Sequence, residues 1–165
     1  MPSFASSLRA YRPDKVYKLP APNKVHNPRV GIALERGRLA NSSGHPDRAV
    51  PQFRAAAELA GRHGLEFLRI DALHMLAIAD PEREPAWTAE ATRAAEASQD
   101  SRTRRWLISL HNNHGWALYD AGDRDGAIAE FELTLEVAEA IGTATQQRYA
   151  HEALDEARRT ATRPG

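Results

Sequence analysis

The chain has 165 residues, of which 27% are charged, and a formal net charge of zero. This size fits one domain with a sizeable core, and the neutral charge argues against nucleic acid or an anionic membrane as the partner. The absence of cysteine excludes disulfides, thiolate metal sites and cysteine nucleophiles. No signal-peptide core and no membrane-length apolar run is present, so a cytoplasmic protein is predicted, and the preference for arginine and alanine suggests a bacterial source.

Residues 1–28 are predicted to form an irregular N-terminal arm. Five of the ten prolines lie in this segment, where they remove backbone donors and favour extended geometry. Tyr11 and Tyr17 are interleaved with basic side chains, and Asp14 is the only acid of the segment. Such a pattern can contact single-stranded nucleic acid, but a solvated leader that lies against the acidic helical body is the favoured interpretation.

Beyond the arm, alanine, leucine, arginine and glutamate dominate and β-branched runs are absent, which predicts an all-α protein. Breakers divide this region into seven predicted helices: 29–42, 46–62, 65–79, 84–98, 102–121, 124–141 and 144–160. Pro46 and Pro81 suit first turns, and Thr143 with Gln146 has the spacing of a capping box. Glycines are predicted to end four helices in the left-handed conformation: Gly44, Gly64, Gly122 and Gly142.

Two helix pairs repeat one pattern at an interval of 78 residues. The segments "GRLANSSGHPDRAVPQF" (37–53) and "GWALYDAGDRDGAIAEF" (115–131) share two glycines, an alanine and a phenylalanine at the same offsets, and a looser middle unit divides the interval into two repeats of about 39 residues. The pattern resembles the tetratricopeptide repeat, in which small residues at the crossing of two antiparallel helices precede A-x-x-x-F on the second helix. His111 and His114 depart from it, because they stand at the family's Trp and Leu positions.

The resemblance implies a right-handed α-solenoid of three such helix pairs plus a C-terminal capping helix, together one domain over residues 29–160, followed by a disordered tail at 161–165. Each helix pair is too small to bury its apolar face alone, so neighbouring units must stack. Small residues at the helix crossings and large aromatic residues between units are predicted to build the core: Gly37, Ala77 and Gly115 with Phe53, Trp87 and Phe131.

The resemblance also implies a concave groove lined by the first helix of each pair. It places eight residues on this surface: Arg38, Asn41, Asp71, His74, Asn112, Trp116, Tyr119 and Asp120. Aromatic side chains beside Asn and Arg suit peptide recognition, since rigid rings supply affinity and amides fix the backbone register. The predicted function is a non-catalytic adaptor that binds a protein or peptide segment, with Trp116 partly exposed. Packing of Trp116 against the adjacent unit is the alternative.

A small-molecule-binding protein or an enzyme that uses the His, Trp and Tyr cluster of the same groove is the alternative function. No HExxH, no glycine-rich phosphate loop and no serine elbow is present, so no catalytic residue and no cofactor is predicted. His74, His111 and His114 could converge on a metal, but partly buried or surface imidazoles are favoured and no metal is predicted. Glu130 is interpreted as part of a solvated helix face. The protein is predicted to be a monomer, with a weak homodimer as the alternative.

Overall fold

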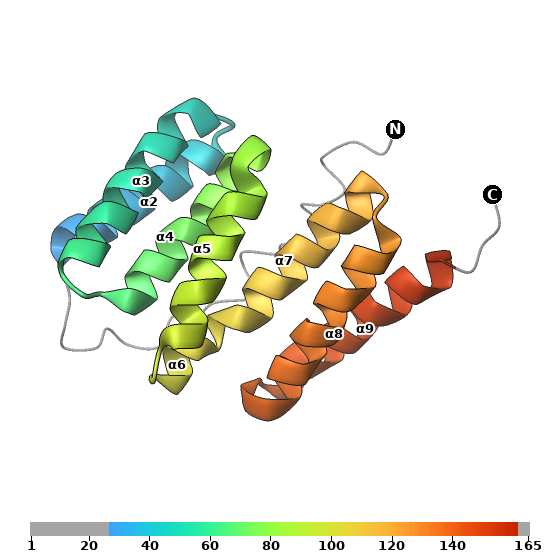
Figure 1. The fold of residues 1–165 in the computed structure, drawn as a ribbon. Coiled ribbons are helices and arrows are strands. Elements are labelled where there is room, and N and C mark those ends of the chain that lie inside the picture. The colour runs from blue at the N-terminus through green and yellow to red at the C-terminus, as the bar shows by residue number, and fades with distance from the viewer. Residues whose placement is uncertain (1–26, 162–165) are drawn as a thin grey trace.

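The computed structural model describes residues 27–161, which fold into helices joined by short loops, without a strand in that range (Figure 1). In chain order these are α2 (Pro28–Ser42), α3 (Pro46–Arg62), α4 (Glu66–Ala79), the 3-10 turn η2 (Pro81–Arg83), α5 (Glu84–Ala97), α6 (Ser101–Arg104), α7 (Trp106–Ala121), α8 (Arg124–Ile141) and α9 (Ala144–Ala161). The predicted all-α class is confirmed for these residues. None of these helices combines the length and apolarity needed to cross a membrane. The predicted irregular arm up to residue 26 and the predicted tail from residue 162 lie outside the described residues.

Three helix ends follow the predicted signals closely. Gly44, Gly64 and Gly122 have positive φ angles of 79°, 63° and 88°. In each case the glycine amide donates to the carbonyl three residues back, and the next amide donates to the carbonyl five residues back at 2.9 Å. Because only a residue without a Cβ atom takes this conformation at little cost, the glycines determine where α2, α3 and α7 end.

The prediction for Gly142 is wrong. Its φ of −85° and ψ of 171° are extended rather than left-handed. The predicted capping box forms: the Thr143 amide donates to Gln146 Oε1 at 2.9 Å, and the Gln146 amide donates to Thr143 Oγ1 at 3.2 Å. Because this capping box starts α9 directly after Gly142, the backbone is extended between α8 and α9, and α8 does not end in a left-handed glycine.

The predicted helix 102–121 is divided into α6 and α7 at Arg105. Asp100 caps α6 by accepting hydrogen bonds from the Thr103 amide at 3.2 Å and the Thr103 hydroxyl at 2.8 Å. The Ile108 amide then bonds to the Arg105 carbonyl, three residues back, at 3.2 Å. This tighter step interrupts the α-helical ladder.

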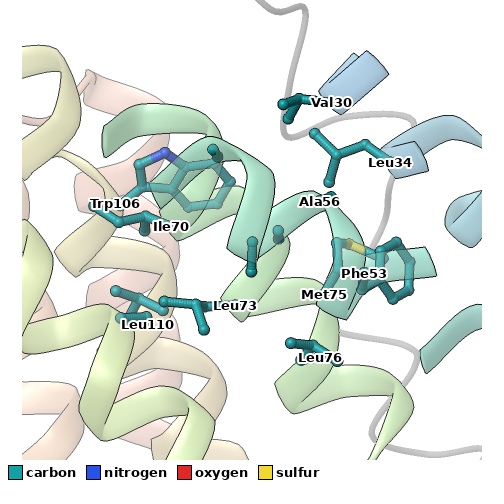
Figure 2. Close-up of a cluster of buried hydrophobic side chains, with 14 of the residues drawn as sticks. Val30, Leu34, Phe53, Ala56, Ile70, Leu73, Met75, Leu76, Trp106 and Leu110 are labelled. Carbon is teal, nitrogen blue, oxygen red and sulfur yellow. The ribbon is translucent and has the colours of Figure 1, made fainter. Parts of the chain in front are cut away.

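Long helices that are consecutive in the chain pack against each other, and the first helix of a pair can also contact the helix that follows the pair. α2–α3, α4–α5 and α7–α8 form antiparallel pairs, α5 packs against α7, and α9 packs against α8 (Figure 1). α2 also contacts α4, as α7 contacts α9. Buried apolar side chains form a large cluster across α2–α5 and the start of α7, part of which Figure 2 shows, and smaller clusters among α7, α8 and α9. α7 therefore belongs to both parts of the core.

The predicted close approach of paired helices occurs in the first and third pairs. A Cβ atom on Gly37 would lie 2.4 Å from a Phe53 ring carbon, and one on Gly115 would lie 2.6 Å from a Phe131 ring carbon. Both phenylalanine rings are fully buried. Trp87 in the middle pair is instead half-buried at the edge of the large cluster, so it fills the space between units less completely than predicted.

Candidate functional site

The eight residues predicted to line a groove lie on α2, α4 and α7, the first helices of the three pairs. Their contacts divide them into two centres. An ion-pair centre joins α2 to α4 through Arg38 and Asp71, and an aromatic centre on α7 contains Trp116 and Tyr119. The other positions flank these centres: Asn41 and Asn112 are half-buried, Asp120 is exposed and His74 is buried.

Arg38 is held by two carboxylates. Its Nη2 atom donates to both oxygens of Asp71, at 2.7 and 2.6 Å, and its Nη1 atom donates to Glu35 at 2.6 Å. Asp71 is only 2% exposed. Burial raises the pKa of the Asp71 carboxyl, and the charge of Arg38 opposes that rise. Because a buried carboxylate needs a paired cation, the ion-pair centre serves first to hold α2 against α4.

His74 lies one turn beyond Asp71 on α4 and is 3% exposed. The centroid of its imidazole lies 5.3 Å from that of the Trp106 ring at the start of α7. Burial lowers the pKa of His74 to about 4, and the positive charge of Arg38 adds to the shift. His74 is therefore neutral at neutral pH. The sequence prediction omits Trp106, which precedes the repeat motif on α7.

The aromatic centre joins three helices. The Trp116 ring packs edge to face on Tyr119, with centroids 5.3 Å apart, and on Phe131 of α8, with centroids 5.0 Å apart. The Arg124 guanidinium lies 3.5 Å from the centre of the Tyr119 ring and donates to the Tyr119 carbonyl. The Tyr119 hydroxyl donates to Glu156 of α9 at 3.5 Å. Both rings remain half-buried, so fixed aromatic surface lies beside a cation and an anion.

Two histidines in the middle of α7 each meet a carboxylate. His114 Nδ1 lies 3.1 and 3.2 Å from the carboxylate oxygens of Glu84 on α5, and His111 Nδ1 lies 2.8 Å from Glu130 on α8. The hydrogen bond with Glu84 raises the pKa of His114. Glu130 is half-buried in this contact, so its predicted place on a solvated face is wrong. The sequence prediction also missed Glu84. The two pairs connect α7 with α5 and with α8.

The metal-site hypothesis for His74, His111 and His114 gains no support from the structure. Within residues 27–161, no group of three or more His, Asp or Glu side chains is arranged to hold a metal ion. His111 and His114 meet different carboxylates, and His74 lies against Trp106. The geometry favours structural roles for these imidazoles.

Comparison with protein-family models, curated proteins and solved structures returns no match to the chain. Within the chain, α2–α3 corresponds to α7–α8, because their helix closures and glycine–phenylalanine contacts recur 78 residues apart.

Proposed function

We propose that residues 28–161 form a tetratricopeptide-like right-handed solenoid and that the protein is a non-catalytic adaptor that binds a peptide or protein segment. Three recurring features support the architecture. The first and third helix pairs share the glycine–phenylalanine crossing, the hydrogen bonds that close the first helix, and contact between that helix and the next first helix. α9 then closes the stack as a capping helix.

The aromatic centre on α7 is the observation that carries the proposed function. Its rings are fixed by Phe131 and Arg124 yet remain half-buried, so they offer rigid apolar area at a small entropic cost of binding. Asn112 lies one turn before Trp116 on the same helical face, where its amide suits a peptide backbone. Arg124 and Glu156 place both signs of charge at the edge. A segment with an apolar or aromatic anchor and polar flanks fits this surface.

In this proposal, the part of the predicted surface on α2 and α4 contributes less to binding. Arg38 and Asp71 are engaged with each other across α2 and α4. The enzyme alternative is less well supported than the adaptor, because His111 and His114 are engaged with carboxylates in helix–helix contacts. Binding is therefore assigned to the part of the surface on α7 and its neighbours α8 and α9.

Selection of peptides from a random display library, with the full-length protein as bait, tests this proposal. Trp116→Ala should weaken the binding of selected peptides roughly 30-fold or more, the effect of losing about 2 kcal/mol at a hot spot. Tyr149→Ala is the matched control, because it removes an exposed ring of α9 outside the aromatic centre, and unchanged affinity is expected. Peptides that bind the Trp116→Ala variant as tightly as the wild type would refute the assignment to α7. Failure to select any peptide would refute the adaptor proposal itself.

A further inference from the structure

The contact between α7 and the middle helix pair changes in character along α7. At its start, Trp106 and Leu110 are buried in the large apolar cluster with α2–α5. In its second half, the apolar side chains that join a core pack with α8 and α9 instead. Toward the middle of α7 the contact with α5 is polar, because His114 Nδ1 lies 3.1 and 3.2 Å from the carboxylate oxygens of Glu84. Part of this junction therefore depends on titratable side chains.

Four titratable side chains from three helices meet at this point. His111 and His114 are three residues apart on α7, so they share one face of the helix. His111 Nδ1 lies 2.8 Å from Glu130 of α8, and the charge of Glu130 also acts on His114. The four side chains are between 12% and 22% exposed. Because Glu130 acts on both imidazoles, His111, His114, Glu84 and Glu130 form one His–Glu cluster rather than two separate pairs.

The two histidines are the cations of this cluster. Within residues 27–161, Glu84 and Glu130 form no ion pair with an arginine, and no lysine lies in that range. Thr88 donates a hydrogen bond to Glu84 at 2.7 Å, which orients that carboxylate without neutralising it. The charge of the cluster is therefore set by the protonation of its imidazoles. Charged side chains elsewhere on the helices around α7 engage other partners: Arg105 with the Ile141 carbonyl, Glu90 with Arg69, Glu132 with Arg158, and Glu156 with Tyr119.

We propose that the His–Glu cluster is a pH-sensitive switch that determines how firmly the third helix pair is held against the pairs before it. With both imidazoles protonated, the two cations balance the two carboxylates, and charge-assisted hydrogen bonds join α7 to α5 and α8. With both imidazoles neutral, two carboxylates remain without a cation in a weakly solvated region, where like charges repel more strongly than in water. The contact at Glu84 then weakens, while the apolar contacts at the start of α7 persist. This inference does not depend on peptide binding at the aromatic centre.

The direction of the switch follows from the hydrogen bond between His114 and Glu84. This bond raises the pKa of His114 above its ordinary value of 6.5, against the effect of burial, and the charges of Glu84 and Glu130 add to the rise. A group whose pKa is raised on folding contributes stability that is fully present below its unfolded pKa and is lost as the pH rises through the folded pKa. The third pair is therefore held firmly in mildly acidic solution and less firmly in alkaline solution.

Titration of the imidazoles by nuclear magnetic resonance, in the full-length protein, tests whether the four side chains form one cluster. Glu84→Gln should lower the pKa of His114 most, because it removes the carboxylate that is hydrogen-bonded to this imidazole. Glu130→Gln should lower the same pKa by less, although Glu130 is hydrogen-bonded to His111. Glu132→Gln, which removes a charge of α8 that pairs with α9, is the matched control and should leave the pKa of His114 unchanged. An unchanged pKa of His114 in Glu130→Gln would divide the cluster into two separate pairs and overturn the proposal.

The chain has no cysteine, so two introduced thiols can carry spin labels at chosen positions. Arg93→Cys/Leu133→Cys places labels at exposed positions of α5 and α8. The distribution of distances between these labels, measured by electron spin resonance, should become about twofold broader between about pH 6 and about pH 9, the range in which histidines lose their protons. Adding His111→Gln and His114→Gln should remove this broadening, because glutamine keeps a hydrogen-bond donor but does not titrate.

Arg48→Cys/Arg93→Cys, with labels at exposed positions of α3 and α5, is the matched control and should show the same distribution at both pH values. An equally wide distribution at both pH values for the Arg93→Cys/Leu133→Cys pair would overturn the proposal. Broadening that persists with His111→Gln and His114→Gln, or that appears equally in the control pair, would assign the effect to other groups and would also overturn it.

Discussion

α4 and α9 begin 78 residues apart, each directly after a helix pair, yet they differ in how far they are buried. Both bury the same four positions: Ala72, Met75, Leu76 and Ala79 in α4, and Ala150, Ala153, Leu154 and Ala157 in α9. α4 also buries Ile70 and Leu73, whereas the corresponding Arg148 and His151 of α9 are exposed. α4 is thus covered at positions where α9 is exposed, and α9 has polar side chains at those positions.

Arg38 on α2 and Trp116 on α7 allow the same comparison within the helix pairs that precede α4 and α9. They occupy equivalent positions on α2 and α7. Arg38 connects its unit to α4 through a buried carboxylate, Asp71, whereas Trp116 packs on Tyr119, whose hydroxyl reaches Glu156 of α9. Equivalent junctions are therefore built with different chemistry: the first is an ion pair, and the second is a contact between aromatic rings.

The largest loss of stability is expected when the two phenylalanine rings that pack against Gly37 and Gly115 are truncated. Phe53→Ala and Phe131→Ala should each lower the free energy of unfolding by about 3–5 kcal/mol, because both rings are fully buried against a glycine of the partner helix. Urea unfolding followed by circular dichroism measures the loss, and Leu133→Ala on the exposed side of α8 is the control. A large loss for one ring and a small one for the other would break the equivalence of the two pairs.

Arg38→Ala and Trp116→Ala compare the two junctions directly. Arg38→Ala leaves the Asp71 carboxylate buried without its cation and should cost about 3 kcal/mol of stability. Trp116→Ala removes a half-buried ring from contacts with Tyr119 and Phe131 and should cost about 1–2 kcal/mol, lowering Tm by several degrees while the fold persists. Thermal unfolding of both variants gives the order. An unfolded Trp116→Ala variant would make this residue part of the core.

Acidification should lower the free energy of unfolding, because His74 on α4 is buried and its pKa is lowered in the folded protein. The pKa of His74 is about 4 when folded and about 6.5 when unfolded, so the unfolded chain takes up the proton first as the pH falls. Stability should therefore drop between about pH 6.5 and pH 4, by on the order of 3 kcal/mol. Urea midpoints across this range measure the drop. His74→Gln should flatten it, whereas His151→Gln, on the exposed face of α9, should not; an unchanged slope in His74→Gln would refute the assignment.

The smallest effect is expected at the contact between α5 and α7, and its pH dependence has the opposite sign. Hydrogen bonding to Glu84 raises the pKa of His114 in the folded protein. The resulting stability is fully present below the ordinary histidine pKa and is lost as the pH rises through the folded pKa. The urea midpoint should thus decline in the wild type as the pH rises above the ordinary histidine pKa, and His114→Gln should remove that part of the decline. A decline of equal size in His114→Gln would assign it to other groups.

Helix positions were predictable because their signals are local. Gly44 and Gly122 end their helices because each adopts the left-handed conformation. Thr143 and Gln146, three residues apart, start α9 through reciprocal hydrogen bonds. The repeat of 78 residues likewise predicted the close approach of paired helices at Gly37 and Gly115, but not that Phe53 and Phe131 contact these glycines. The break at Arg105 was missed because no glycine or proline marks it; only the tightened ladder does.

The sequence predicted which helices carry the candidate site, but it did not predict which residues of the site contact one another. The pair of Arg38 with Asp71 joins positions 33 residues apart, and the pair of His114 with Glu84 joins positions 30 residues apart. No local pattern specifies such partners, since they depend on how one helix pair stacks on the next. The burial of His74 depends on stacking in the same way, because Trp106 packs against it from another helix.

α7 takes part in two cores while its middle stays polar. Trp106 and Leu110 belong to the large cluster with α2–α5, whereas Trp116 packs with α8 and α9. Detachment of α8 and α9 would therefore leave the first part of the protein packed, so amide protons of α8 and α9 should exchange through local opening at lower free energy than those of α3 and α4. A ligand seated on Trp116 would oppose that opening. Slower exchange in α8 and α9 would then report binding even where no helix changes position.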